Sequence, residues 1–477
     1  MNLRKTVFWL HLAAGLTAGM VIAIMSFTGA ALAFENEIVA WAERDARRIG
    51  PPPAAPDGAA PARLSLDDLV ARVRADQEIE ARPTAVTVSA GPADAVTLAF
   101  GRDATWYANP YTGVARQPAS TRVHDFMHLM EDWHRRLAMA GDNRATGRAI
   151  TGACNAAFFV LAVTGLYLWW PRRWTWRALR PSVRFMKLRG RARDWNWHNV
   201  VGFWSLPVLI VLTATGMVIS YRWASNLVWR VAGEEPPAQG AGPGGAAASG
   251  SDLKIDRPEG ARRIGYAGAF EHIAAAIPDW SQITLREGLG GRRGAPPPAA
   301  ATGDSSAPAE AAGQRPAAES LAGNATGRGE RSGGERAARG ERGERGQGAE
   351  RRSGQGEQRA GGGGRAPQPY SATVRQDAVW PPFASTQLVL NPWTGETLSR
   401  SGYADQTPGR KLRGWMRQLH TGAALGWPGQ LLAGLASLGG VVLVYTGFAL
   451  SWRRFFQRRK VAAPVVSPAA EPARQRP

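Results

Sequence analysis

The sequence predicts an α-helical integral membrane protein with four transmembrane helices, arranged as two parallel repeats that each carry a small α+β domain outside the membrane. Three observations predict this fold class. The apolar residues of the 477-residue chain are gathered into four long runs, basic residues cluster beside the ends of these runs, and short motifs recur in the same order in both halves. A soluble globular chain would instead spread its apolar residues along the sequence.

Four segments have about 20 apolar residues, the length that crosses the hydrocarbon core of a bilayer as a helix. They are residues 8–34, 149–170, 200–221 and 430–452. The first segment also has features of a cleaved signal peptide, because Arg4 and Lys5 precede it and it ends in the A-x-A pattern Ala31-Leu32-Ala33. It is longer than the roughly 7–15 residues of a signal-peptide apolar core. We therefore interpret it as a transmembrane helix.

The positions of the basic residues predict the orientation in the membrane. A formal net charge of +20 would suit a nucleic-acid partner, but the charges crowd beside the apolar runs. They fill the loop between the second and third runs (Arg172, Arg173, Arg177, Arg180, Arg184, Lys187, Arg189, Arg191, Arg193) and follow the fourth (Arg453, Arg454, Arg458, Arg459, Lys460). Short loops rich in Lys and Arg stay in the cytoplasm. We expect both termini there, a lipid environment and no nucleic-acid partner.

These assignments divide the chain into eight parts. They are transmembrane helix 1 (1–35), a first external domain (36–145), helix 2 (146–171), a basic cytoplasmic loop (172–196), helix 3 (197–222), a second external domain (223–427), helix 4 (428–453) and a cytoplasmic tail (454–477). Within the second external domain, about 288–369 is rich in Gly, Arg, Glu, Ala and Pro and almost lacks large apolar side chains. Such a segment cannot bury a core, so we expect it to be disordered.

Each external domain reads as a small α+β unit. In the first, residues 64–73 form an amphipathic pattern with Ser65 as a candidate N-cap, and residues 85–100 alternate as a hairpin does. In the second, the matching elements are a helix at 266–276 and strands at 282–286, 370–375 and 387–390. The two domains therefore have similar predicted content.

Short motifs repeat between the two halves. His11, Gly15, Thr28 and Gly29 have the same spacing as His198, Gly202, Thr215 and Gly216. The second and fourth apolar runs share T-G-x-x-L-x-W at 164–170 and 446–452, and the external domains share N-P-[YW]-T-G at 109–113 and 391–395. Both halves would start on the cytoplasmic side, as parallel repeats do.

Histidines are the candidate metal ligands. The only cysteine, Cys154, rules out an intrachain disulfide and a multi-cysteine metal cluster. Four of the seven histidines fall at repeat-equivalent positions, His11 with His198 and His134 with His420. A single histidine at membrane depth is often structural, but two symmetric pairs favour a shared function. Neutral imidazole is an axial haem ligand, so we expect two haem b groups, one near each side of the membrane.

Several neighbouring residues have two interpretations. Gly15 and Gly202, one helical turn after His11 and His198, would leave room for a flat macrocycle or allow close helix packing. His124 and His128 are alternative ligands or, as we favour, surface residues. Three arginines near the second pair would bind haem propionates or an anionic substrate, or extend toward the membrane surface: Arg148, Arg410 and Arg413.

The motifs together resemble the PepSY-associated transmembrane family. They are W-x-H at 9–11, Trp197-His198, L-H-x-G at 419–422, the two N-P-[YW]-T-G segments and the two T-G-x-x-L-x-W helices. The resemblance covers nearly the whole chain except 288–369 and the C-terminal tail. It implies PepSY folds for the external domains and the four paired histidines as ligands. The halves differ at 132–135 and 418–421, which read D-W-H-R and Q-L-H-T.

The resemblance also implies a function. Members resemble iron-regulated inner-membrane proteins of Gram-negative bacteria, some of which bind haem and reduce ferric siderophores in the periplasm. This chain lacks an evident nicotinamide or flavin fingerprint, so its electron donor would be a quinol or a cytoplasmic reductase. One alternative is a non-redox PepSY sensor or protease-regulating protein with structural histidines. A transporter is a weaker alternative, because the apolar runs lack acidic residues and helix breaks.

Overall fold

The structure is a computed structural model that describes residues 3–50, 62–101, 104–171, 174–237, 255–288 and 368–456. Four long helices dominate it: α1 (Leu3–Leu32), α6 (Arg144–Trp169), α8 (Gly190–Ser220) and α12 (Gly426–Phe455). Each is long and apolar enough to cross a membrane. All four predicted spans are therefore confirmed as helices. Each helix extends beyond the predicted range by several residues at one end or at both.

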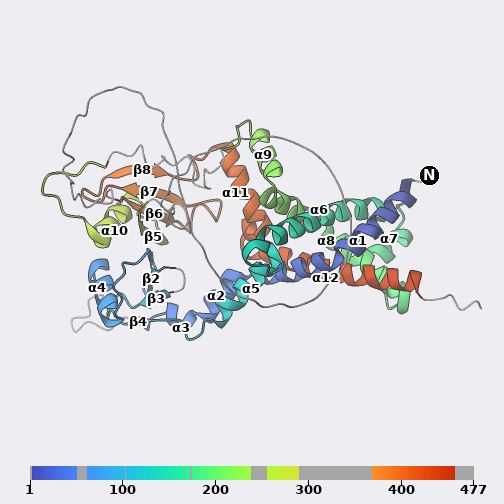
Figure 1. Ribbon diagram of the computed structural model, residues 1–477, viewed down its shortest axis with the longest axis horizontal. Coiled ribbons are helices and arrows are strands. Elements are labelled where there is room, and N and C mark those ends of the chain that lie inside the picture. The colour runs from blue at the N-terminus through green and yellow to red at the C-terminus, as the bar shows by residue number, and fades with distance from the viewer. Residues whose placement is uncertain are drawn as a thin grey trace, which may run out of the picture. The chain divides into compact units, whose positions relative to one another are not determined.

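Small residues let the long helices approach one another closely. Helix α12 packs against both α8 and α1, which lie beside it in Figure 1, and α6 packs against the same two helices. A Cβ atom on Gly440 would come within 2.7 Å of Ser26 Oγ, and one on Gly439 within 3.1 Å of Ser205 Cβ. Close contact through small residues is typical of helix pairs in membranes.

The strands form one antiparallel sheet of eight strands in the order β4-β3-β2-β1-β5-β6-β7-β8. Their bounds are β1 Ala85–Ser89, β2 Val96–Phe100, β3 Ala104–Ala108, β4 Ala115–Arg116, β5 Gln282–Glu287, β6 Tyr370–Arg375, β7 Thr386–Leu390 and β8 Thr397–Ser401. Strands β1 and β5 pair with Val86 opposite Leu285, so the two halves of the chain meet at the centre of the sheet. The strands of the first half lie on one side of this junction and those of the second half on the other.

Helices α4 (Leu66–Asp76) and α10 (Gly265–Ala276) form the core of this domain with the sheet. Leu69 of α4 and Ile273 of α10 are completely buried. The Asp67 carboxylate of α4 accepts hydrogen bonds from the backbone N–H groups of Tyr266 and Ala267, at 2.8 and 3.0 Å, and so caps the start of α10. The two predicted external units therefore share one sheet and one core.

Short helices connect the sheet to the long helices. They are α2 (Glu35–Ala42), α3 (Arg44–Arg47), α5 (Arg122–Arg136), α9 (Arg222–Val231) and α11 (Pro408–Thr421), with 3₁₀ turns at Gly141–Asn143 and Ala423–Leu425. A further short helix, α7 (Trp176–Val183), lies between α6 and α8 and packs against α8. Helix α5 packs against α1 and α6, and α11 packs against α8 and α9. These contacts place the ends of α5 and α11 against the long helices.

A buried carboxylate joins α5 to the sheet. Glu43, 4% exposed, bonds to Tyr107 of β3 at 2.8 Å, to Arg47 at 2.6 Å, and to His124 of α5 at 2.7 Å. Burial raises the pKa of Glu43, but the hydrogen bonds from Tyr107 and Arg47 outweigh it and hold the pKa below its usual value. The ionised carboxylate is thus the form that suits the folded structure.

Most sequence expectations for the external elements are confirmed. Ser65 accepts a hydrogen bond from Asp68 N and caps α4, and β1 and β2 form the expected hairpin. The predicted helix at 266–276 and the three predicted strands of the second half are also present. Most of the segment predicted to be disordered, 289–367, lies outside the described residues, as does 457–477 of the tail. The two-repeat organisation and the orientation in the membrane stay predictions.

Candidate cofactor site

Each of the four paired histidines bonds through Nδ1 to a threonine on another helix. The distances from Nδ1 to Oγ1 are 2.8 Å for His11–Thr164, 2.9 Å for His198–Thr446, 3.2 Å for His134–Thr28 and 3.3 Å for His420–Thr215. These threonines belong to the Thr-Gly pairs that recur along the sequence. The sequence motif thus supplies a partner for every candidate ligand.

The hydrogen bonds of the threonines determine which imidazole nitrogen carries the proton. Each hydroxyl lies 2.6 to 2.8 Å from the backbone carbonyl four residues earlier in its own helix and donates its single hydrogen there. The hydroxyl oxygen then accepts from histidine Nδ1–H. The Nδ1 atoms of His134 and His420 also lie 2.9 Å from the carbonyls of Met25 and Leu212. The lone pair of each ring is therefore on Nε2, the atom that is available to a metal.

The glycine after each threonine makes room for the imidazole ring. A Cβ atom on Gly29 would lie 3.1 Å from His134 Cε1, and one on Gly216 would lie 3.1 Å from His420 Cε1. The corresponding distances are longer for Gly165 beside His11 (3.5 Å) and Gly447 beside His198 (3.8 Å). The Thr-Gly pair therefore combines a hydrogen-bond acceptor with space for the ring.

The second histidine pair consists of His134 and His420. They lie near the C-terminal ends of α5 and α11, which end at left-handed Leu137 (φ 52°) and Gly422 (φ 76°). Their ring centres are 6.2 Å apart and their planes are inclined by 54°. Two imidazoles that bind one metal from opposite sides, at metal–nitrogen distances of about 2 Å, have ring centres about 6 Å apart. The separation of the pair therefore fits one shared metal.

The first histidine pair consists of His11 and His198, which line one cavity among the four long helices. The cavity has a volume of about 700 Å³, within the roughly 300–1,000 Å³ of cofactor-sized sites. Gly15 and Gly202 line it, and added Cβ atoms there would meet only Leu161 at 3.9 Å and Leu443 at 3.5 Å. These glycines leave open space, which favours the interpretation that they make room for a flat group.

Four cations also line this cavity. Arg4 and Lys5 come from the start of α1, Arg191 from the start of α8 and Arg454 from the end of α12. Arg4 donates a hydrogen bond to the Leu168 carbonyl at 2.6 Å. The lining residues include no Asp or Glu. This charge favours a ligand with carboxylate groups at this end of the cavity.

The donor set fits haem better than a free metal ion. Among the described residues, no group of three or more His, Cys, Asp or Glu side chains could hold a metal. A haem iron already has four porphyrin nitrogens and needs only two axial ligands, which each histidine pair can supply. The cavity beside the first pair adds an apolar wall and cations for the two propionates. The residues of both pairs therefore fit this group.

The other predicted candidates have different environments. His124 of α5 bonds to Glu43, between α2 and α3, and His128 lies 3.9 Å from Glu131 of its own helix, so each of these histidines has a carboxylate neighbour. Arg413 bonds to Ser225 Oγ at 3.2 Å, near the start of α9. Sequence reasoning named the four threonines only as repeat markers. Their constant place before glycine in a membrane helix was the signal that could have identified them as histidine partners.

A search of curated proteins found no match to this chain. The model of one protein family, described as the PepSY-associated TM region, matches residues 8–454. The match includes nearly all of the four long helices, both histidine pairs and every strand of the sheet. This multi-pass membrane protein therefore belongs to the PepSY-associated transmembrane family.

Proposed function

We propose that this protein is a haem-containing electron-transfer protein of the bacterial inner membrane, which reduces a ferric siderophore or another ferric chelate in the periplasm for iron uptake. When bound, haem b supplies reversible one-electron chemistry between Fe(III) and Fe(II). One observation carries the proposal: in both histidine pairs Nδ1 bonds to a threonine, and Nε2 has no hydrogen bond to any residue that the structure describes. Four solitary structural histidines would not need this shared arrangement.

The chain's own residues have three tasks in this proposal. His11 and His198 would hold one haem through Nε2, and His134 and His420 would hold the other. The threonine hydroxyls fix the ring orientation and increase the basicity of Nε2, as acceptors bonded to the other imidazole nitrogen do. The helices exclude water from the ligands, which tunes the redox potential together with the hydrogen bonds.

The two pairs lie at different depths along the helices. His11 is near the start of α1, whereas His134 contacts Thr28 near its end. Seventeen residues separate His11 from Thr28, which corresponds to about 26 Å of helix rise. With the basic ends of the helices in the cytoplasm, the first pair is on the cytoplasmic side and the second on the periplasmic side. A quinol or a cytoplasmic reductase would supply the electrons.

The proposal is tested with the full-length protein in detergent. The purified protein is reduced with dithionite under argon, separated from excess reductant and mixed with a ferric chelate, while a coloured Fe(II) chelator reports the product. We expect about one Fe(II) for each electron stored on the protein. His420→Ala should abolish the rapid formation of Fe(II). His128→Ala, which changes an exposed histidine on α5, should leave the rate of Fe(II) formation unchanged.

Two results would contradict the proposal. If protein from cells with ample haem shows no haem absorbance, the histidines are structural, and the non-redox PepSY sensor or protease regulator becomes the better interpretation. If haem is present but the reduced protein does not reduce any ferric chelate, the protein transfers electrons to another acceptor or carries haem, and the reductase function is wrong.

A further inference from the structure

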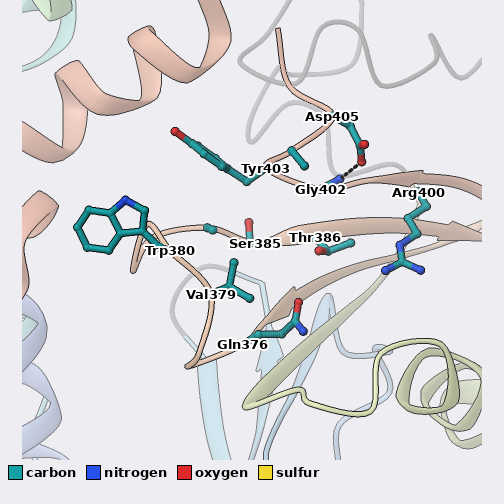
Figure 2. Close-up of a pocket in the computed structure, with 11 residues that line it drawn as sticks. Gln376, Val379, Trp380, Ser385, Thr386, Arg400, Gly402, Tyr403 and Asp405 are labelled. Carbon is teal, nitrogen blue, oxygen red and sulfur yellow. Dashed lines mark hydrogen bonds between the residues drawn. The ribbon is translucent and has the colours of Figure 1, made fainter. Parts of the chain in front are cut away.

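A second cavity lies at the edge of the sheet in the second half of the chain. It has a volume of about 650 Å³ and is bounded by the connection between β6 and β7, residues 376–385, and by the edge strand β8 with the turn after it. Figure 2 shows its side chains around an open space, with Trp380 and Arg400 on opposite sides. The histidine pairs do not line this cavity.

The walls of this edge cavity offer two different kinds of contact. The Trp380 side chain is 67% exposed although it is large and apolar. On the opposite side, Arg400 has no ion pair with any carboxylate among the residues that the structure describes. The Asp405 carboxylate already accepts a hydrogen bond from Gly402 N at 2.7 Å. An aromatic face and an arginine together suit an anionic ligand that carries a flat unsaturated ring.

Hydroxyl and amide groups lie between these two contacts. Ser385, Thr386 and Gln376 line the cavity with their polar side chains, as Figure 2 shows. Lys411 of α11 lies 5.5 Å from the Tyr403 ring centre and bonds to the Ala404 carbonyl at 3.0 Å, which brings a second cation to this region. The cavity therefore offers both hydrogen bonds and positive charge to a polyoxygenated ligand.

An aromatic cluster connects the edge cavity to the helix of the second histidine pair. Trp415 of α11 donates a hydrogen bond to Tyr403 Oη at 2.8 Å. The Trp415 ring centre is 5.1 Å from that of Phe383 and 6.2 Å from that of Trp380. Trp415 precedes His420 by five residues of the same helix, a rise of about 7.5 Å. A ligand on Trp380 would thus lie one aromatic contact away from the helix that carries His420.

The first half of the chain has no corresponding cluster among its described residues. The connection between β2 and β3 is only residues 101–103, against ten residues between β6 and β7. Five residues before His134, the position of Trp415 is taken by Leu129. The histidine–threonine contacts are alike in both halves, whereas the edge cavity and its aromatic cluster lie in the second half. An electron acceptor needs only one docking site, so a cluster found in one half favours a role in binding the acceptor.

We propose that the edge cavity binds the electron acceptor, and that its ligand class is an anionic metal chelate with aromatic oxygen donors, such as a catecholate. An aromatic ring of the chelator stacks on Trp380 and its negatively charged oxygens face Arg400. This assignment rests on the proposed function, because it names the acceptor that this function requires. Reduction converts the ferric ion to Fe(II) by one electron, which the donor side of the protein supplies. No covalent bond of the chelator is formed or broken in this step.

Binding is tested with a chelate that cannot accept an electron. The probe is the gallium(III) complex of 2,3-dihydroxybenzoate, titrated calorimetrically into the full-length protein in detergent. We expect Trp380→Leu and Arg400→Gln each to weaken binding by about tenfold, the size of one ring-stacking or charged contact. Trp380→Phe should retain most of the affinity. Arg116→Gln, which alters an exposed arginine on the opposite edge strand β4, is the matched control and should change nothing.

The outcomes separate this proposal from the proposed function. Gallium citrate is anionic but has no ring, and we expect it to bind about tenfold more weakly than the aromatic chelate. Equal binding of the two chelates, unchanged binding by Trp380→Leu and Arg400→Gln, or no binding would overturn the proposal. Because gallium binding needs no haem, loss of haem in His420→Ala with intact gallium binding would support the cavity assignment independently. Haem absorbance with no gallium binding would leave the proposed function in place and reject the cavity.

Discussion

The hydrogen bond from each histidine to its threonine predicts how single substitutions alter the two sites. Thr164→Val keeps the shape of the side chain but removes the hydroxyl that bonds to His11 Nδ1 at 2.8 Å. Among the described residues, no other acceptor for this Nδ1 is within hydrogen-bond distance. Loss of such a partner behind a ligand typically lowers metal affinity by about 10- to 100-fold. We expect a loss of this size for the first histidine pair.

Thr28→Val should have a smaller effect on the second pair. His134 Nδ1 is 3.2 Å from the Thr28 hydroxyl but only 2.9 Å from the Met25 carbonyl, which the substitution leaves in place. One acceptor therefore remains, and we expect a loss of about threefold or less. The two valine substitutions are chemically identical, so their difference isolates the effect of the carbonyl.

The assay is transfer of haem from each variant to excess apomyoglobin, followed by absorbance. Thr164→Ser and Thr28→Ser retain the hydroxyl and are the matched controls, which should behave as the wild-type protein does. Equal haem loss from Thr164→Val and Thr28→Val would contradict a role of the threonine hydroxyl in holding the ligand, as would wild-type haem retention in Thr164→Val. In either case the threonines would serve helix packing and not ligand orientation.

Three further substitutions test other parts of the structure. Gly15→Leu should fill the cavity and remove haem from the first pair only, whereas Gly15→Ala should be tolerated because its Cβ would meet Leu161 at 3.9 Å; the haem content of each variant checks this. The pKa of Glu43 is depressed in the folded protein, so its contribution to stability is present above the ordinary value of 4.5 and is lost as the pH falls through the folded pKa. Glu43→Gln should therefore weaken the dependence of the unfolding temperature on pH in the acid range. An unchanged pH dependence would contradict the stabilising role of the Glu43 hydrogen bonds. Asp194→Asn should destabilise the protein by about 3 kcal/mol, because Asp194 is 1% exposed and pairs with Arg193 and Arg453. Thermal unfolding compared with Asp45→Asn, whose side chain is exposed, measures the difference.

The long helices and the histidine positions could be predicted from the sequence because their signals are local. An apolar run of fixed length defines a span, and equal spacing from His11 and His198 to the two Thr-Gly pairs is visible without a structure. The partner of each histidine could not be predicted in the same way. His11 bonds to Thr164 of α6, 153 residues away, although Thr28 on its own helix has the more obvious spacing.

The single sheet was not predicted for a similar reason. Its central pairing joins β1 and β5, and Thr87 opposes Thr284 across nearly 200 residues of sequence that include two of the long helices, α6 and α8. Strands β3, β4 and β8 were not predicted; β4 (Ala115–Arg116) is only two residues long, and β8 (Thr397–Ser401) is polar and half exposed. Edge strands carry a weak hydrophobic pattern, since one of their sides is not paired. The edge cavity depends on β8 and so could not be anticipated.

The most direct test of two bis-histidine sites is the ratio of haem to protein in single histidine variants. Haem is measured as its pyridine complex and protein by amino-acid analysis, after expression with ample haem. We expect two haems per chain in the wild-type protein and one in each of His11→Ala, His198→Ala, His134→Ala and His420→Ala. The two variants of one pair should retain a haem with the same spectrum. A wild-type ratio of one or zero, or different remaining spectra for His134→Ala and His420→Ala, would contradict the pairing.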